Sequence, residues 1–195
     1  MFNKILVHIS VNTVAAYQVA GRLDMLVFLP IFSIAASLTT LVGMFYGAKE
    51  YRALRYIIKY GIFSALLITI ISSTIVYTFA GHVVRFFTDD ASIVIIAVNF
   101  LQIFAFAYPF ISVGITTGRV LQGLGKGLPV LIITIVRVLG VSAPLALFFV
   151  FIMDKTVEWV WYSMMLSTIV AFGIGLTWLI STLKTLPTSG QSLNN

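Results

Sequence analysis

The chain has 195 residues, of which 60% are hydrophobic and 9% are charged, and its mean hydropathy is +1.08. Soluble domains carry about 25% charged residues, so a water-soluble fold is excluded and lipid must be the solvent. The net charge of +6 indicates membrane orientation rather than nucleic acid binding, because the basic residues cluster in short loops between apolar runs. There is no cysteine, which excludes disulfides, and with two histidines and six carboxylates we expect no metal cluster or cofactor.

The first residues, MFNKILVHIS, are too few to cross a membrane. One interpretation is a signal peptide, with Lys4 as its charged region and AAYQVA as its small-residue end. We prefer the last turns of a preceding helix whose beginning is missing, because His8, Ser10 and Asn12 interrupt the apolar core. The closeness of the next span to Met1 leads to the same expectation of a truncated gene or a wrong start.

Five apolar segments are long enough for membrane-spanning helices, which need about 20 mostly apolar residues. The predicted spans are residues 13–47, 57–81, 91–119, 128–153 and 158–183. The loops between them are short, so neighbouring helices must run antiparallel. The prediction is an all-α polytopic membrane helix bundle that forms one lobe over residues 1–186, followed by a polar C-terminal tail over residues 187–195.

Basic residues divide unequally between the two sides of these spans. One side carries Lys49, Arg52, Arg55, Lys59, Arg119, Lys126 and Lys184. The other side carries Lys4, Arg85 and Lys155 together with Asp89, Asp90, Asp154 and Glu158. The positive-inside rule places the first side in the cytoplasm. We therefore expect a multi-pass protein of the inner or plasma membrane, with the C-terminus cytoplasmic and the N-terminus outside.

The first predicted span contains two ionisable residues, Arg22 and Asp24, which are costly in lipid and usually functional there. They are two residues apart and point about 200° apart around a helix, so they do not pair directly. In one interpretation one or both, together with Gln18, face a central cavity and bind a cationic substrate or a coupling ion. In the other, Arg22 extends to the membrane surface and Asp24 contacts a neighbouring helix.

Three further polar residues lie inside later spans. Arg137 is ten residues into its span and should face protein or water, where pairing with a carbonyl or a polar side chain is the preferred interpretation. Asn99 and Gln102 are three apart and share a helical face. They either line a polar, substrate-binding or ion-binding cavity or form hydrogen bonds across helices.

Pro30, Pro109 and Pro144 each fall inside an apolar span. Proline removes a backbone hydrogen bond and kinks a helix. A static kink is the default interpretation, and a structural or gating role, in which the helix bends between transport states, is the alternative.

Two pairs of glycines, Gly43-xxx-Gly47 and Gly114-xxx-Gly118, match the small-residue pattern of close helix packing.

No group of residues in the sequence matches a known catalytic arrangement. LQGLGKG lacks the spacing of a phosphate-binding loop, and the hydroxyl residues of the last span have no histidine in the same or an adjacent span. We therefore expect no enzymatic activity.

Three segments resemble the C-terminal lobe of a MATE (multidrug and toxic compound extrusion) transporter. AAYQVAGRLDMLVFLPIFSIAASLTTLVGMFYGA resembles the second helix of that lobe, with Ala15, Ala16, Tyr17, Arg22, Asp24, Pro30, Ala35, Ala36, Val42, Gly43, Gly47 and Ala48. LQIFAFAYPFISVGITTGRVLQGLGKG resembles the tenth helix of the family, with Leu121, Gly123 and Gly125 at its exit. TIVRVLGVSAPLAL resembles the eleventh helix, where Arg137 and Pro144 fit.

The resemblance implies a secondary antiporter that exports drugs or organic cations in exchange for H⁺ or Na⁺. MATE proteins have twelve helices in two lobes, and this chain corresponds to helices eight to twelve plus a stub of the seventh. It is therefore expected to be inactive without the missing N-terminal lobe or a partner subunit. The segment that resembles the tenth helix carries no carboxylate, which puts ion coupling through this lobe in doubt.

Two other functions stay open at this point. One is a non-transporting membrane subunit or an inert gene remnant. The other is a related flippase for lipid-linked sugars, although such flippases carry more cationic residues in the cavity than the two candidates here, Arg22 and Arg137.

Overall fold

A computed structural model of the chain describes residues 10–153 and 156–187. In this part of the chain all regular structure is helical, and five helices are long and apolar enough to cross a membrane. The elements are α2 (Val11–Gly47), α3 (Tyr51–Arg85), α4 (Ala91–Gly123), α5 (Leu128–Ile135), η1 (Val136–Ser142), α6 (Ala143–Leu147), η2 (Phe148–Ile152) and α7 (Val157–Lys184). The predicted all-α bundle of five spans is confirmed. The stub predicted at residues 1–9 and the tail from residue 188 lie outside the described residues.

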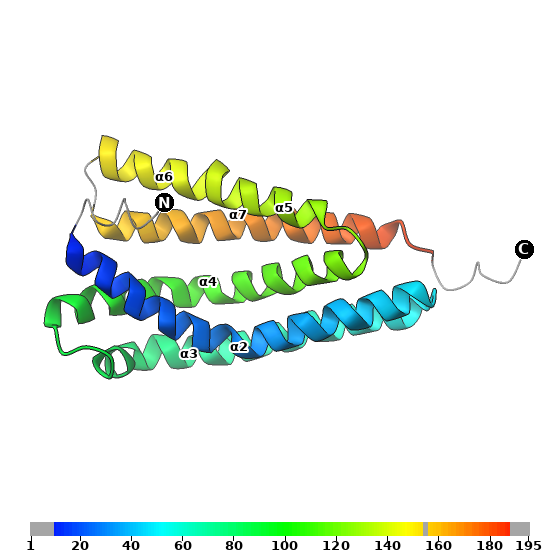
Figure 1. Cartoon of the computed structure of the whole chain (residues 1–195), viewed down its shortest axis with the longest axis horizontal. Helices are drawn as coiled ribbons and strands as arrows, with labels where there is room; N and C mark the ends of the chain where they lie inside the picture. The colour runs from blue at the N-terminus through cyan, green and yellow to red at the C-terminus, as the bar shows by residue number, and fades with distance from the viewer. Residues whose placement is uncertain (1–9, 154–155, 188–195) are drawn as a thin grey trace, which may run out of the picture.

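The spans run up and down, as the short loops require (Figure 1). The ends of α2, α4 and α7 and the beginnings of α3 and α5 lie at one end of the bundle, which is also the end rich in lysine and arginine. The predicted loop GAKEYRALR is mostly helix, because α3 already begins at Tyr51. The turn before α3 places Lys49 at a φ of 59°, and the turn after α4 places Gly125 at a φ of 76°.

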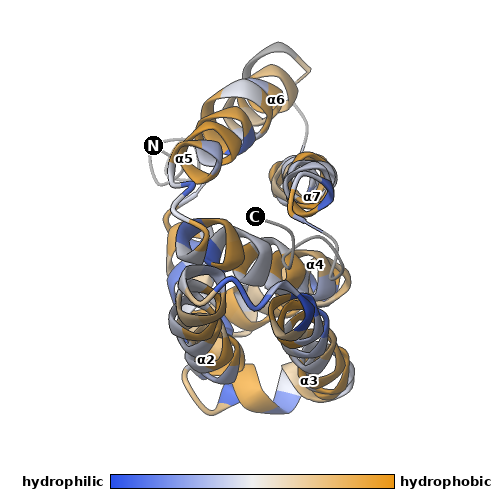
Figure 2. Cartoon of the chain, turned by 90° about the vertical axis from the view of Figure 1, so that its right-hand side faces the viewer, coloured by the Kyte–Doolittle hydropathy of each residue, from blue (hydrophilic) through white to orange (hydrophobic). Residues whose placement is uncertain are grey.

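Helix α4 lies at the centre of the bundle and has its most extensive contacts with α2 and α3. Figure 2 shows α2, α3 and α4 grouped together, with α5–α6 and α7 on the far side of α4. The larger core cluster contains the buried rings of Phe100, Tyr108 and Trp161. A smaller cluster near the basic end includes Leu54 and Leu179. Large apolar side chains on the outer faces remain exposed, as expected of surfaces that contact lipid.

Pro109 lies inside an uninterrupted α-helix, and the hydrogen bond that it removes is replaced from a neighbouring helix. A proline has no backbone N–H, so the carbonyl oxygen four residues earlier, that of Ala105, loses its helical donor. The hydroxyl of Ser73 on α3 donates to this oxygen. In lipid an unsatisfied carbonyl is costly, so this contact fastens α3 to the middle of α4.

Pro144 acts differently, because the helix before it widens into a π-helix. Residues 136–142 form η1, and the backbone N–H of Ala143 bonds the carbonyl oxygen of Val138, five residues earlier. A π-turn of this kind accommodates the donor that Pro144 lacks. The kink predicted at Pro144 is therefore a π-helical segment, and Arg137 lies within it.

The predicted GxxxG pairs take part in close helix contacts only in part. No described atom lies within 4 Å of a Cβ built at Gly47 or Gly114, and the nearest atoms to such a Cβ at Gly43 and Gly118 are at ordinary van der Waals distances. Tighter positions are Gly123, where an added Cβ would lie 2.7 Å from the carbonyl oxygen of Thr39, and Gly61, where it would lie 2.5 Å from the side chain of Leu38. The prediction of close packing is confirmed at Gly43, where an added Cβ would lie 3.6 Å from the carbonyl oxygen of Gly123 on α4. It is wrong at Gly47 and Gly114, because spacing along one helix does not fix which face meets a neighbour.

Candidate functional site

The carboxylate of Asp24 is held between α2 and α4. Tyr108 donates its hydroxyl proton to Asp24 Oδ1. Tyr108 is fully buried and lies near the middle of α4, so this hydrogen bond is deep in the bundle. Asp24 has no cationic partner among the described residues. A carboxylate in such a place is costly unless a cation or a further hydrogen bond balances its charge.

Aromatic rings surround this pair. Tyr17 is two helical turns before Asp24 on α2, and its ring stacks on Trp161 of α7 with centroids 5.8 Å apart. The ring of Phe28 meets that of Tyr108 edge to face at 5.3 Å. The indole N–H of Trp161 is buried and has no hydrogen-bond partner among the described residues. The described side chains around the Asp24 carboxylate are thus mainly aromatic, and its one hydrogen-bond donor is the hydroxyl of Tyr108.

The two other polar candidates on α2 do not join this site. Arg22 and Gln18 are exposed, and neither makes a hydrogen bond or an ion pair with a described residue. Arg22 and Asp24 lie on different faces of α2, as their spacing predicts. Whether Arg22 or Gln18 contacts a substrate stays a prediction.

Asn99 and Gln102 also lie apart from Asp24. Asn99 donates from Nδ2 to Oε1 of Glu158 at 2.7 Å, which joins α4 to the first turn of α7. This contact is the hydrogen bond across helices that was one of the two interpretations. Gln102 is half-buried and makes no hydrogen bond with a described residue. Neither residue lines the cavity described next.

A partly enclosed cavity of about 330 Å³ lies between α4, α7 and the segment α5–η1, with Phe32 of α2 at one edge. Its size is at the lower end of the range for small-molecule sites. The lining is mostly apolar and includes the aromatic rings of Phe110 and Phe172. Of the predicted site residues, only Arg137 lines it.

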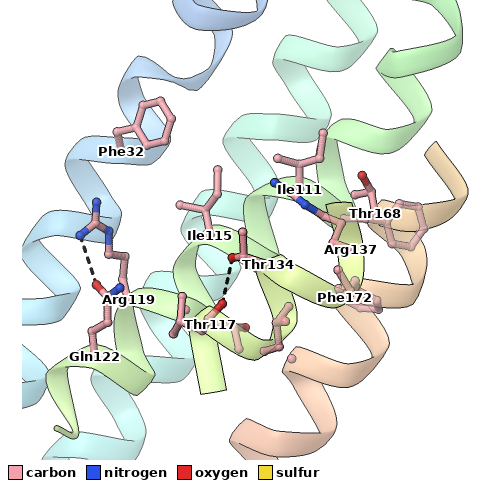
Figure 3. Close-up of a pocket in the computed structure, with 17 residues that line it drawn as sticks. Phe32, Ile111, Ile115, Thr117, Arg119, Gln122, Thr134, Arg137, Thr168 and Phe172 are labelled. Atoms are coloured by element: carbon pink, nitrogen blue, oxygen red, sulfur yellow. Dashed lines mark hydrogen bonds between the residues drawn. The ribbon is translucent and has the colours of Figure 1, made fainter. Parts of the chain in front are cut away.

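The polar groups of the cavity are mainly hydrogen-bond donors. Figure 3 shows Arg119 and Arg137 on opposite sides of the cavity, with Ile115 and Thr134 between them. Arg119 Nη1 donates to Oε1 of Gln122 at 3.2 Å. Arg137 is half-buried and makes no hydrogen bond or ion pair with a described residue, so the predicted pairing of Arg137 with a carbonyl or side chain is not formed within the described part of the chain.

Aromatic rings connect the two sites. Tyr108, which holds Asp24, contacts Phe28, and the ring of Phe28 lies 6.3 Å from that of Phe32. Phe32 lines the cavity. A series of ring contacts therefore runs from the hydrogen-bond partner of Asp24 to the cavity wall.

Sequence reasoning missed Tyr108, Thr117 and Arg119 as functional candidates. Tyr108 is 84 residues from Asp24 along the chain, and no local pattern links them. Arg119 was counted only as a charge that sets orientation. The one available signal was the position of these residues on the segment that resembles the tenth helix.

The chain is similar to known membrane transport proteins. The family model described as MatE matches residues 1–148. A probable multidrug resistance protein NorM from Thermotoga maritima is 28% identical over 146 residues, which cover 75% of this chain and 32% of that protein. A probable NorM from Bacillus cereus is 29% identical over 175 residues, which cover 88% of this chain and 37% of that protein.

Solved structures show the same fold. A transporter of the MOP superfamily from Pyrococcus furiosus superposes with a TM-score of 0.87 at 26% identity, over 96% of this chain and 42% of that one. A MATE crystal structure in the straight conformation also gives a TM-score of 0.87, at 27% identity, over 94% of this chain and 41% of that one. The chain spans about a third of the length of the curated relatives it matches. The resemblance to MATE transporters is confirmed.

Proposed function

The chain belongs to the MatE family, and from this membership we propose that it forms one helical lobe of a drug-exporting secondary transporter. It is a multi-pass membrane protein with five spans. Its relatives bear the name of probable multidrug resistance proteins. The observation that carries the proposal is the half-buried carboxylate of Asp24 between two spans, in a lobe that also holds a cavity of small-molecule size.

Export in this proposal requires a second lobe. In many secondary transporters the substrate lies at the interface of two repeats that rock against each other. The five helices match about two fifths of the solved transporter chains, which supports the proposal that they form one such unit. We therefore propose that the lobe acts together with an N-terminal lobe or partner subunit and does not transport alone.

The coupling ion, H⁺ or Na⁺, is proposed to bind at Asp24. The support is the position of the carboxylate deep between two helices with no cationic partner among the described residues. Ion binding removes the charge that would otherwise be buried in the span. Through Phe28 and Phe32 the neutralised site would favour a different position of the cavity wall, which is the coupling that antiport needs.

The proposed orientation follows from charge. The end that carries Arg55, Lys126 and Lys184 faces the cytoplasm of an inner or plasma membrane, and the beginning of α2 faces outside. Arg55 also caps α7, because its Nη2 donates to the carbonyl oxygens of Leu183 and Leu186 at 2.9 and 3.1 Å.

In this proposal the lobe acts as part of a transporter and not as an enzyme. Gating at Pro30, Pro109 and Pro144 stays a prediction.

A dye export assay tests this proposal. Everted membrane vesicles would contain the chain alone, or the chain together with the N-terminal half of the Thermotoga maritima relative. We expect no uptake of ethidium, a cation, or of 8-anilinonaphthalene-1-sulfonate, an anion, into vesicles with the chain alone. With both parts we expect uptake of at least one of these dyes, driven by a proton or sodium gradient. Gradient-driven uptake by the chain alone would contradict the need for a second lobe. Folded and associated parts without any gradient-dependent uptake would support the non-transporting alternative.

A further inference from the structure

The cavity between α4, α7 and α5–η1 has an unbalanced charge. Two arginines, Arg119 and Arg137, line it, and no acidic residue is among the described residues that do so. Its other polar side chains are three threonines and Gln122. An organic cation that entered this cavity would meet two positive charges and no carboxylate.

Arg137 has the stronger need for a counter-charge. It lies nine residues after the beginning of α5, which places its backbone about 14 Å along the span at 1.5 Å per residue. It is half-buried and has no hydrogen bond or ion pair with a described residue. A guanidinium group at this depth is costly without an anion, and its planar donors suit a carboxylate or a phosphate.

Thr117 supplies a second free donor. Its side chain is 2% exposed, lines the cavity, and its hydroxyl has no hydrogen-bond partner among the described residues. The other two threonines are engaged with their own helices: Thr134 donates to the carbonyl of Val130, and Thr168 to that of Met164. A buried hydroxyl without a partner is costly, so a ligand atom that accepts its proton would be stabilising.

From this arrangement we propose that the cavity binds an amphiphilic anion, whose phosphate, sulfonate or carboxylate group is held by Arg137 with Thr117, and whose apolar body lies on the rings of Phe110 and Phe172. Arg119, at the other side of the cavity, adds attraction for the same charge (Figure 3). The inference deepens the proposed export function, because it names the charge class of a molecule that this lobe takes. The anion can come from the membrane as a lipid or from solution as a drug-sized compound.

Binding can be measured by native mass spectrometry of the full chain in a neutral detergent. The lipid probes are dioleoylphosphatidate and dioleoylglycerol, which share their acyl chains and differ by the phosphate. The soluble probes are 8-anilinonaphthalene-1-sulfonate, an aromatic anion, and ethidium, an aromatic cation. We expect one molecule of an anionic probe per chain, bound at least about tenfold more tightly than its uncharged or cationic counterpart. Which of the two anions binds identifies the source.

Variants locate the site. Arg137→Gln should weaken binding of the anion at least about tenfold, and Thr117→Val should weaken it less. Arg137→Lys keeps the charge and should retain the preference for anions, which separates loss of the site from loss of folding. Arg85→Gln, an exposed arginine at the end of α3, is the matched control and should bind as the unaltered chain does.

Equal binding of the charged and uncharged lipids, or a preference for ethidium in this cavity, would overturn the inference. Equal weakening by Arg137→Gln and Arg85→Gln would do the same, because it would show a general effect of net charge. Since the assay measures binding without export, anion binding by the chain together with an absence of gradient-driven uptake when the chain is joined to an N-terminal half would contradict the proposed function alone.

Discussion

The two halves of this lobe are held together in different ways. In α2, α3 and α4, the helices meet through specific contacts: Tyr108 with Asp24, Ser73 with the carbonyl of Ala105, and Gly123 against the backbone of Thr39. In the other half, the span from residue 128 to 152 alternates between α- and π-helix, and a cavity separates part of it from α4 and α7. The lobe thus combines a packed frame, formed by α2, α3 and α4, with a span whose helix contains two π-helical segments and borders a cavity.

The largest effect is expected at the carboxylate. Tyr108→Phe removes the hydrogen bond to Asp24 and leaves this half-buried carboxylate without its donor. The loss should lower the free energy of unfolding by about 1.5–3 kcal/mol. Unfolding by sodium dodecyl sulfate in mixed micelles measures this. Tyr77→Phe, on an exposed ring, is the control and should change little. In an Asp24→Asn background Tyr108→Phe should cost less, and full additivity would show that the pair does not interact.

The close approach of α2 and α4 comes next. Gly123→Ala places a methyl group against the backbone of Thr39 and the side chain of Val42, and should destabilise the lobe by about 1–3 kcal/mol in the same assay. Gly21→Ala has no neighbour within 4 Å among the described atoms and should be neutral or stabilise by up to about 1 kcal/mol. Equal effects of the two substitutions would show that the frame is not tightly packed at Gly123.

A smaller effect is expected at Ser73. Ser73→Ala leaves the carbonyl of Ala105 without a donor and should cost about 1–2 kcal/mol of unfolding free energy. Pro109→Ala restores a backbone donor for that carbonyl, so Ser73→Ala should cost clearly less in that background. Ser37→Ala, which removes an exposed hydroxyl, is the control. An undiminished cost in the Pro109→Ala background would mean that Ser73 acts in some other way.

The smallest effect on stability, but a clear one on structure, is expected at Pro144. Pro144→Ala supplies the missing N–H and should let residues 136–142 return to an α-helix, with a change in unfolding free energy within about 0.5 kcal/mol because the residue is exposed. Slower amide hydrogen exchange over these residues would record the change. The side chain of Arg137, which lies within this segment, would then point in a different direction around the helix axis, so anion binding in the cavity should weaken. Unchanged exchange would show that Pro144 does not cause the π-helix.

The fold was predictable because lipid restricts the choices. A continuous apolar stretch of about 20 residues can only be a helix in a membrane, and short loops fix the antiparallel order. The motif around Arg22 and Asp24 and the Gly-rich end of α4 led correctly to the family. The single-lobe boundaries and the roles of the candidate residues stay predictions.

The contacts of the site were not predictable, since they depend on how helices rotate and slide against each other. Asp24 was singled out by its cost in lipid, but its partner Tyr108 belongs to another helix 84 residues away. Similarly, Pro109 and Pro144 look alike in the sequence. Only the structure shows that Ser73 replaces the missing donor at the first and that a π-helix accommodates the second.

The most direct test of the central claim, that Asp24 couples an ion to drug export, is gradient-driven dye transport by the lobe joined to a second lobe. Vesicles with the unaltered lobe and with Asp24→Asn should be compared, with Arg22→Gln as a neighbour on another face of α2. We expect that Asp24→Asn still assembles but loses uptake driven by a proton or sodium gradient. Undiminished gradient-driven uptake by Asp24→Asn would contradict it.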